Sequence, residues 1–404
     1  MLEVRRDGEL IAQLDTTRSG RLVCVYSDHV VDEFPGGTPL LSCSLPVSTQ
    51  PQDASGWTRG LLPEGRHLAG VAAAADLAAS DTYGLLARYG RDIAGAFEVI
   101  EGNAAPRTPT IDAYTEESLA TELAAVEENP LGIHDDSELS IAGLQDKLLV
   151  VRTADGRWAR PRYGYPSSHI LKLESGPHTG LLRAEAAGLE LGRRVGLVTF
   201  DSWLEVIGEQ EVLVVERFDR ASVDGAVKRL HQEDLLQSLG IQPEGRQGRA
   251  KYQELGTAGP PSWWHLADRL DSYAEDRNHQ LGELLRVMVF NLVLGNADAH
   301  AKNLALILEG GHAALAPLYD VVPTQLWPRL RRTQALTIAD KNDPEAITIH
   351  DLHTEAARWS VSRAIAEPLV GDVLALIREA SQDLDHPEVS ALVGSNIDRL
   401  IMGT

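Results

Sequence analysis

Three oxygen-bearing side chains lie close together in the stretch from Phe290 to Pro323. Asp298 lies in a loop after one apolar run, and Asn303 follows five positions later at the start of a second apolar run. A third apolar segment, Ala313 to Tyr319, leads directly into Asp320. Hard divalent cations prefer oxygen ligands of this kind, and a carboxylate can also accept a proton from a reacting hydroxyl group. These residues are therefore candidates for metal-assisted chemistry.

The spacing of the first two residues, Asp-x-x-x-x-Asn, is that of the catalytic loop of protein kinases. In that loop the Asp orients the attacking hydroxyl, the Asn holds a magnesium ion, and a later Asp completes the metal site. Asp and Asn are also frequent in ordinary turns, because they hydrogen-bond to their own backbone. All three residues lie at the ends of strongly apolar segments, where a rigid scaffold would present them from loops. This position favours a catalytic loop over ordinary turns.

Two upstream segments could contact phosphate groups. Residues 140–147, SIAGLQDK, form a small-residue turn that leads into the apolar strand 148–151, and such a turn exposes backbone N–H groups. Lys172 is the only charge in the strand pattern HILKL, and the predicted helix Leu181 to Val195 supplies Glu185 as its natural ion-pair partner. An ordinary β-turn and two surface charges would explain the same residues.

Sequence patterns in the rest of the chain predict the strands and helices that position these groups. A hairpin opens the chain, with strands at 2–6 and 9–14 joined by Asp7-Gly8. The apolar strand Val212 to Val215 ends in ERFDR, where we expect a hinge between two lobes. Residues 230–237 should open a helix, and 242–261, rich in Gly, Pro and charge, should form a mobile surface loop. Further helices are predicted at 263–270, at 282–293 and between 351 and 402, with a break at His386-Pro387.

Composition limits the class of protein. A chain of 404 residues with 43% hydrophobic and 24% charged residues is ordinary for a globular protein of two or three domains. The net charge of −22 argues against direct binding of nucleic acid and suits a basic partner. Cys24 and Cys43 match no metal or disulfide pattern, so we expect buried thiols. No leader or membrane-length apolar run is present in the sequence, which favours a cytoplasmic protein that binds no membrane.

Six motifs, in this order, resemble the HipA family of bacterial serine/threonine kinases, the toxins of HipBA-type toxin–antitoxin pairs. They are SIAGLQDK, HILKL, ERFDR, LHQEDLLQ, GNADAHAKN and LYDVVP, and GLLPEG and GRDIAGAF resemble the N-terminal part of that family. The resemblance implies an α+β, protein-kinase-like two-lobed fold. It would comprise an N-terminal mixed α/β subdomain (1–105), a β-rich N-lobe with the phosphate-binding loop and hinge (106–218), and a mostly helical C-lobe with the catalytic loop (219–404).

The resemblance also implies roles for single residues, with ATP and Mg²⁺ as cofactors. Asp298 would be the catalytic base, Asn303 and Asp320 the magnesium ligands, and Ser140 the site of autophosphorylation. Leu144 and Asp146 differ from the Ala and Glu of the best-known members. The residues implied to contact ATP are Ala142, Gly143, Leu144, Gln145, Asp146, Lys147, Lys172, Glu216, Arg217, Phe218, His300, Lys302, Asn303, Tyr319 and Asp320.

Family members bind a small DNA-binding antitoxin and act on a translation component. The resemblance therefore implies a HipB-like antitoxin as partner, DNA contact only through that antitoxin, and a protein substrate of the glutamyl-tRNA synthetase type. Two alternatives stay open, because a fold does not fix the acceptor. One is a kinase of a small molecule or lipid headgroup, and the other is a catalytically silent module that holds a repressor on DNA.

Overall fold

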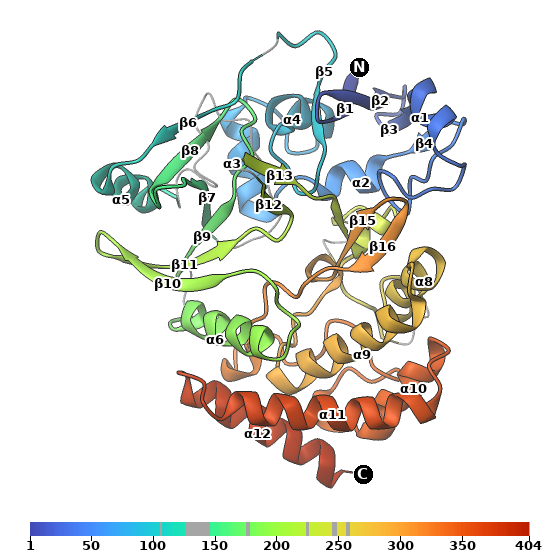
Figure 1. Cartoon of the computed structure of the whole chain (residues 1–404), viewed down its shortest axis with the longest axis vertical. Helices are drawn as coiled ribbons and strands as arrows, with labels where there is room; N and C mark the ends of the chain where they lie inside the picture. The colour runs from blue at the N-terminus through green and yellow to red at the C-terminus, as the bar shows by residue number, and fades with distance from the viewer. Residues whose placement is uncertain are drawn as a thin grey trace.

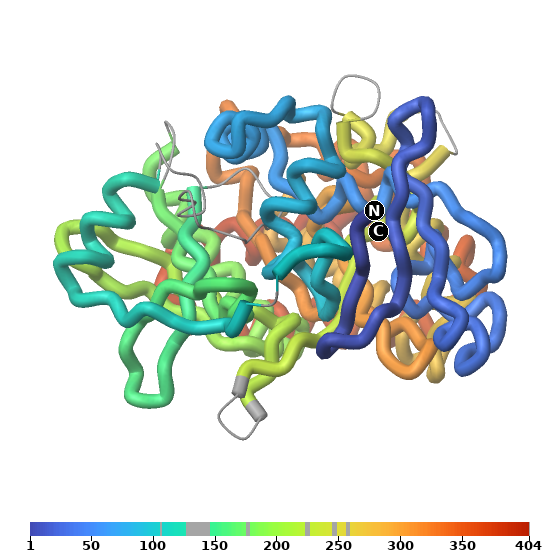
Figure 2. The backbone as a smooth tube through the Cα atoms, turned by 90° about the horizontal axis from the view of Figure 1, so that it is seen from above, coloured from blue at the N-terminus to red at the C-terminus, as the bar shows by residue number. Residues whose placement is uncertain are grey.

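The computed structural model describes residues 1–105, 107–126, 146–174, 178–223, 226–244, 249–255 and 259–403. These residues form a mixed α/β protein of three parts that pack against one another (Figure 1). The N-terminal part and the β-rich second part lie side by side, as the view from above shows (Figure 2), and most helices of the C-terminal part lie beneath both. Ser140, Ala142, Gly143, Leu144 and Gln145 lie outside the described residues.

An antiparallel sheet with the order β4-β3-β2-β1-β5 forms the N-terminal part. The predicted opening hairpin is present, and its two turn residues, Asp7 and Gly8, both have positive φ, as a tight hairpin turn requires. Cys24 and Cys43 are buried free thiols, as expected, and burial raises the pKa of Cys24 to about 12. The elements are β1 (Leu2–Arg6), β2 (Glu9–Thr16), β3 (Leu22–Tyr26), α1 (Asp28–Glu33), β4 (Gln52–Asp53), α2 (Ser55–Gly60), α3 (Gly65–Ala74), α4 (Thr82–Tyr89) and β5 (Glu98–Glu101).

The second part is built on an antiparallel sheet with the order β10-β11-β9-β7-β8-β6. Strands β7, β9 and β11 lie at its centre, and each contains a run of buried residues that are apolar except for Lys147 and Lys172. Helix α6 lies along the side of this sheet that faces the C-terminal part (Figure 1). The elements are β6 (Thr110–Ala113), α5 (Glu116–Ala124), β7 (Lys147–Arg152), β8 (Trp158–Arg162), β9 (His169–Leu173), α6 (Leu181–Arg194), β10 (Ser202–Ile207) and β11 (Gln210–Glu216).

The C-terminal part is mainly helical but contains short strands. The helix predicted to open within 230–237 is wrong for most of that segment, because Gln232–Asp234 pairs with β15 as a strand and Asp234 caps a helix of four residues. The elements are β12 (Arg220–Val223), β13 (Ala226–Arg229), β14 (Gln232–Asp234), α7 (Leu235–Ser238), α8 (Trp263–Tyr273), α9 (Arg277–Leu294), η2 (Ala301–Asn303), β15 (Ala305–Glu309), β16 (His312–Leu315), η3 (Thr324–Leu326), η4 (Pro344–Ala346), α10 (Ile349–Arg358), α11 (Arg363–Ser381) and α12 (Pro387–Met402).

Helix α9 is the central element of the C-terminal part. Its second half is buried on every side, with α8, α11 and α12 packed around it. Gly295 ends the helix with φ 77°, and a Cβ there would also lie 2.9 Å from Oε1 of Gln325. Only glycine satisfies both conditions at low cost. The helix end, and with it the loop that carries Asp298, is therefore fixed in position.

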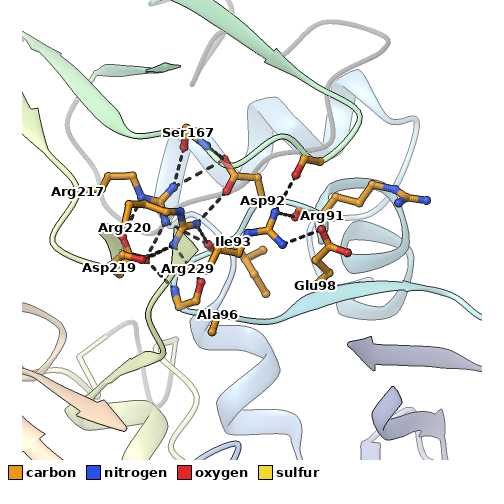
Figure 3. Close-up of polar contacts among 12 residues, drawn as sticks. Arg91, Asp92, Ile93, Ala96, Glu98, Ser167, Arg217, Asp219, Arg220 and Arg229 are labelled. Atoms are coloured by element: carbon orange, nitrogen blue, oxygen red, sulfur yellow. Dashed lines mark hydrogen bonds and ion pairs between the residues drawn. The ribbon is translucent and has the colours of Figure 1, made fainter. Parts of the chain in front are cut away.

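A buried ion network joins the end of β11 to the N-terminal part (Figure 3). Arg217 and Arg220 both contact Asp219, with nitrogen–oxygen distances of 2.8 and 2.9 Å, and Arg220 contacts Asp92 at 2.9 Å. The two guanidinium groups also donate to the carbonyl oxygen of Ile93. Burial opposes ionisation of Asp92, but the two arginines outweigh it and hold the pKa of Asp92 below its usual value.

No helix among the described residues is both long and apolar enough to cross a membrane.

We predict that Asp92→Asn strongly destabilises the protein. Removing one partner from a buried network leaves uncompensated charge, which typically costs about 3–5 kcal/mol. The midpoint of chemical denaturation, followed by tryptophan fluorescence, should fall accordingly. Asp155→Asn is the control, since it removes an exposed partner of Arg157 and should leave the midpoint unchanged. Equal midpoints for the two variants would contradict the prediction.

Candidate active site

A cavity of about 550 Å³ lies where the three parts of the chain meet. Helix α2 and the loops after it contribute to its wall, as do the sheet of the second part and the loops around β15 and β16. Residues from each part line it: Gly60, Glu64 and Ala94 from the first, Lys147, Lys172 and Glu216 from the second, and Asp298, Asn303 and Asp320 from the third. The N-terminal part is therefore a structural component of the site.

Most of the residues that the sequence suggested converge on this cavity. They are Lys147, Lys172, Glu216, Arg217, Phe218, Asp298, His300, Lys302, Asn303, Tyr319 and Asp320. Asp146 differs from them, because its carboxylate accepts hydrogen bonds from Arg66 at 2.7 Å and pairs with His67 at 2.9 Å. Asp146 thus links the start of β7 to α3, and it is not among the residues that line the cavity.

Lys172 lies between two carboxylates. It is 8% exposed, and its Nζ contacts Oε1 of Glu185 and, at 2.8 Å, Oδ1 of Asp320. The expected pairing with Glu185 is thus present, and the alternative of two surface charges is wrong. Burial disfavours the charged lysine, but Asp320 and Glu185 outweigh it and raise the pKa of Lys172.

Close packing of α6 brings these groups together. A Cβ at Gly188, three residues after Glu185, would lie 2.3 Å from the carbonyl oxygen of Val321. The helix can therefore approach the Asp320 loop only with glycine at this position. Asp320 itself has φ 55°, a conformation that is uncommon for a residue other than glycine. Strain of this kind persists where surrounding contacts fix it, and the contact with Lys172 is one of them.

A network of hydrogen bonds holds the loop that carries Asp298. Asn296 donates from Nδ2 to Asn291 at 2.8 Å, and its Oδ1 accepts from the backbone N–H of Asp298 at 3.2 Å. The Asp298 carbonyl oxygen accepts from the His300 N–H at 2.7 Å and from Nδ2 of Asn303 at 3.3 Å. Asp298 and Asn303 are therefore held side by side, with both side chains at the cavity.

Sequence reasoning missed two residues beside Asp298. Tyr252 donates from its hydroxyl to Oδ1 of Asp298 at 3.0 Å, and Lys251, 6% exposed, contacts Glu64 at 3.2 Å. The prediction of a mobile surface loop over 242–261 is thus wrong for these two positions. Burial raises the pKa of Asp298 above its usual value. The hydrogen bond from Tyr252 and the charge of Lys251 lower the pKa, but they offset this effect only in part. No motif spacing marks these residues in the sequence.

The segment after β11 presents backbone groups and an aromatic ring to the cavity. The guanidinium group of Arg217 is buried in the ion network, where it contacts Asp219 and Ser167 (Figure 3). The Phe218 ring stacks on Tyr319, with centroids 5.3 Å apart. The Phe218 N–H has no hydrogen-bond acceptor among the described residues.

Lys302 and His300 do not present free positive charges to a phosphate group. Lys302 is buried and contacts Asp234 at 2.7 Å and the Gly60 carbonyl oxygen at 3.4 Å. His300 is buried as well, and burial lowers its pKa to about 3, so the ring is neutral. Lys147 and Lys172 are therefore the cations of this cavity that the sheet of the second part provides.

Asn303 and Asp320 fit a magnesium ion. Asn303 uses Nδ2 as a donor, and its Oδ1 accepts no hydrogen bond from the described residues. The Asp320 side chain is 39% exposed at the cavity. No group of three His, Cys, Asp or Glu side chains that could hold a metal occurs in the described part of the chain. An ion would therefore need further ligands, as Mg²⁺ does when it bridges substrate phosphates.

Comparison with known proteins supports one family. Residues 2–100 match the family model of the HipA N-terminal domain, and residues 139–381 match that of the HipA-like C-terminal domain. The protein Y4mE of Sinorhizobium fredii is 31% identical over 354 residues, which cover 84% of this chain and 81% of that protein. The serine/threonine-protein kinase toxin HipA of Shewanella oneidensis is 28% identical over 305 residues, or 72% of this chain and 68% of the toxin.

A solved structure has the same fold. A chain from the complex of Shewanella oneidensis HipA, HipB and operator DNA aligns with a TM-score of 0.83 at 22% identity, and the alignment covers 100% of this chain and 96% of that one. This likeness confirms the predicted α+β, kinase-like fold class.

We predict that a nucleotide bound in this cavity would be accompanied by uptake of a proton at alkaline pH. Burial and the neighbouring charge of Lys172 lower the pKa of Lys147 to about 8, so Lys147 is charged below that pH and neutral above it. Phosphate groups favour the charged form, so affinity should fall as pH rises above 8, by at most about tenfold per pH unit. Calorimetry in two buffers of different ionisation enthalpy, at pH 6.5 and 9, measures the uptake.

The control for this measurement is Lys147→Met, which cannot take up the proton. Binding by the unsubstituted protein without proton uptake at pH 9 would contradict the prediction.

Proposed function

The chain belongs to the HipA family, and from this premise we propose that it is an ATP- and magnesium-dependent serine/threonine protein kinase that acts as the toxin of a toxin–antitoxin pair. The observation that carries the proposal is that Lys172, Asp298, Asn303 and Asp320 reach one cavity from separate elements. These are the residue types that phosphoryl transfer needs for positioning and charge stabilisation. A silent binding module would have no need for this arrangement.

Each group has a distinct task in this proposal. Asp298 orients the acceptor hydroxyl and accepts its proton. Lys147 and Lys172 stabilise negative charge on the nucleotide phosphates, and the free N–H of Phe218 binds the nucleobase edge. Asn303 and Asp320 would hold magnesium, which neutralises charge on the phosphates.

We predict that Asp298→Asn lowers the rate of phosphoryl transfer by about 10²- to 10⁴-fold, because general base catalysis typically contributes that much. ATP affinity and the unfolding midpoint should stay close to those of the unsubstituted protein, since asparagine can still accept the bond from Tyr252. Transfer from labelled ATP to protein in a cell lysate measures the rate. A variant that transfers phosphate at the normal rate would exclude Asp298 as the base.

The metal requirement gives a second prediction. Asn303 and Asp320 are hard oxygen ligands, so magnesium or manganese should support transfer and zinc should not replace them. Because two protein ligands make a weak site, magnesium should bind the free protein weakly and bind tightly only with ATP. Calorimetry of magnesium binding with and without ATP tests this. Tight binding without nucleotide would be the contrary result.

The proposed partner is a small DNA-binding antitoxin of the HipB type, and the proposed substrate is a translation component such as glutamyl-tRNA synthetase. Support for the partner comes from the net charge of −22, which favours a basic protein and opposes direct contact with DNA phosphates. A gel shift on operator DNA separates the two modes. Submicromolar binding by this chain alone at physiological salt would contradict the proposal.

Autophosphorylation at Ser140 is also proposed as an off-switch. The residue lies outside the described residues, so the support is the resemblance of SIAGLQDK to the family motif. Lys302, which could have paired with a phosphorylated Ser140, already contacts Asp234. Mass spectrometry after long incubation with magnesium and ATP tests the proposal, and no phosphate on Ser140 would exclude it.

A further inference from the structure

Tyr252 contacts the carboxylate that we assign as the catalytic base, although no motif marks this tyrosine. Its hydroxyl lies 3.0 Å from Oδ1 of Asp298. The other oxygen, Oδ2, accepts no hydrogen bond from the described residues. The carboxylate thus has one oxygen held by the protein and one that is free for a substrate hydroxyl.

The backbone around Tyr252 is held on two sides. The Lys251 carbonyl oxygen accepts from the N–H of Ala301, in the same loop as Asp298, at 3.1 Å. Gln253 donates from its N–H to the Ala335 carbonyl oxygen at 3.0 Å, and its side chain accepts from the Thr337 N–H at 2.9 Å. These hydrogen bonds on either side of Tyr252 fix the position of its Cα atom.

The ring of Tyr252 is held as well. The Arg331 guanidinium carbon lies 4.4 Å from the ring centroid, and His300 packs on the ring in a T-shaped arrangement with centroids 5.5 Å apart. Lys251 lies on the ring at a greater distance, 5.8 Å. A ring fixed by backbone, cation and aromatic contacts gives its hydroxyl one direction, and that direction is toward Asp298.

We propose that Tyr252 is a positioning residue for phosphoryl transfer, which holds Asp298 so that Oδ2 faces the acceptor hydroxyl. This inference rests on the proposed kinase function and adds a residue to it. The role belongs to the hydroxyl, because the ring contacts with Arg331 and His300 need no oxygen atom. Misplacement of a catalytic group by about 1 Å can cost about 10²-fold in rate.

The test compares Tyr252→Phe with the unsubstituted protein. The variant keeps the ring and its contacts but loses the bond to Asp298. We expect kcat for transfer to fall by about 10- to 100-fold, while the Kd for ATP and the KM for the acceptor protein change less than about twofold, since neither depends on the orientation of the base. The unfolding midpoint, measured in parallel, should stay unchanged.

Two further variants make the result specific. Tyr252→Ala removes the ring as well, and its kcat should be no higher than that of Tyr252→Phe. Tyr273→Phe removes a hydroxyl from α8, away from the residues that line the cavity, and should leave kcat unchanged. A normal kcat for Tyr252→Phe, or losses of kcat and ATP affinity in equal measure, would overturn the positioning role while leaving the kinase proposal intact. Absence of transfer by the unsubstituted protein would overturn both.

Discussion

Arg217 and Arg220, buried directly after β11, fix the relative position of the chain's three parts. Strand β11 belongs to the sheet that provides Lys172, and the chain enters the C-terminal part just beyond it. The two guanidinium groups bind Asp92 and the Ile93 carbonyl oxygen, both of which belong to the N-terminal part. In the proposed two-lobed arrangement this segment would be the hinge. Separating these buried charges would leave some of them uncompensated, so the network would limit rotation there.

The same arrangement explains why the N-terminal part lines the cavity. Glu64 reaches Lys251, and the Gly60 carbonyl oxygen reaches Lys302, so the N-terminal part binds two lysines of the C-terminal part. Each of these lysines is buried, and a buried cation is tolerated only with such partners. The N-terminal part thus neutralises the charge of Lys251 beside the site, and it also binds the segment after β11. Its removal would leave the cavity without one wall and Lys251 without Glu64, whereas Lys302 would keep Asp234.

The sequence predicted those features that depend on neighbours along the chain. The opening hairpin followed from Asp7-Gly8 between two strand-like segments, and the helix before the Asp298 loop followed from an apolar run that ends at Gly295. Strand β14 was missed because its pairing with β15 involves residues about 70 positions away, and the sequence predicted a helix over 230–237 instead. Local signals cannot report a distant strand partner.

The candidate site divides in the same way. Lys172, Asp298, Asn303 and Asp320 could be named because motif spacing marks them, and the contact of Lys172 with Glu185 followed from the order of strand and helix. Tyr252 and Lys251 could not be named, since a Gly/Pro-rich segment normally indicates a solvated loop. The burial of this segment depends on the Asp298 loop and on residues near 335, which no local pattern reveals. Arg217 is the opposite case: the motif that contains it was recognised, but its side chain lies in the ion network.

The contact between Lys172 and Asp320 bears on how the proposed ligands bind. In the structure each of these charges neutralises the other at 2.8 Å. Under the proposed function, Lys172 would turn to phosphate oxygens and Asp320 to a magnesium ion. Releasing only one of them would leave the other with reduced compensation in a buried site, which is costly.

Lys172 keeps Glu185 as a second partner, so it can exchange Asp320 for phosphate without losing all its compensation. Asp320 has no second cation at bonding distance among the described residues, although the nearby charge of Lys147 also lowers its pKa. An incoming cation would therefore favour the exchange at Asp320, and nucleotide and metal should each strengthen the binding of the other.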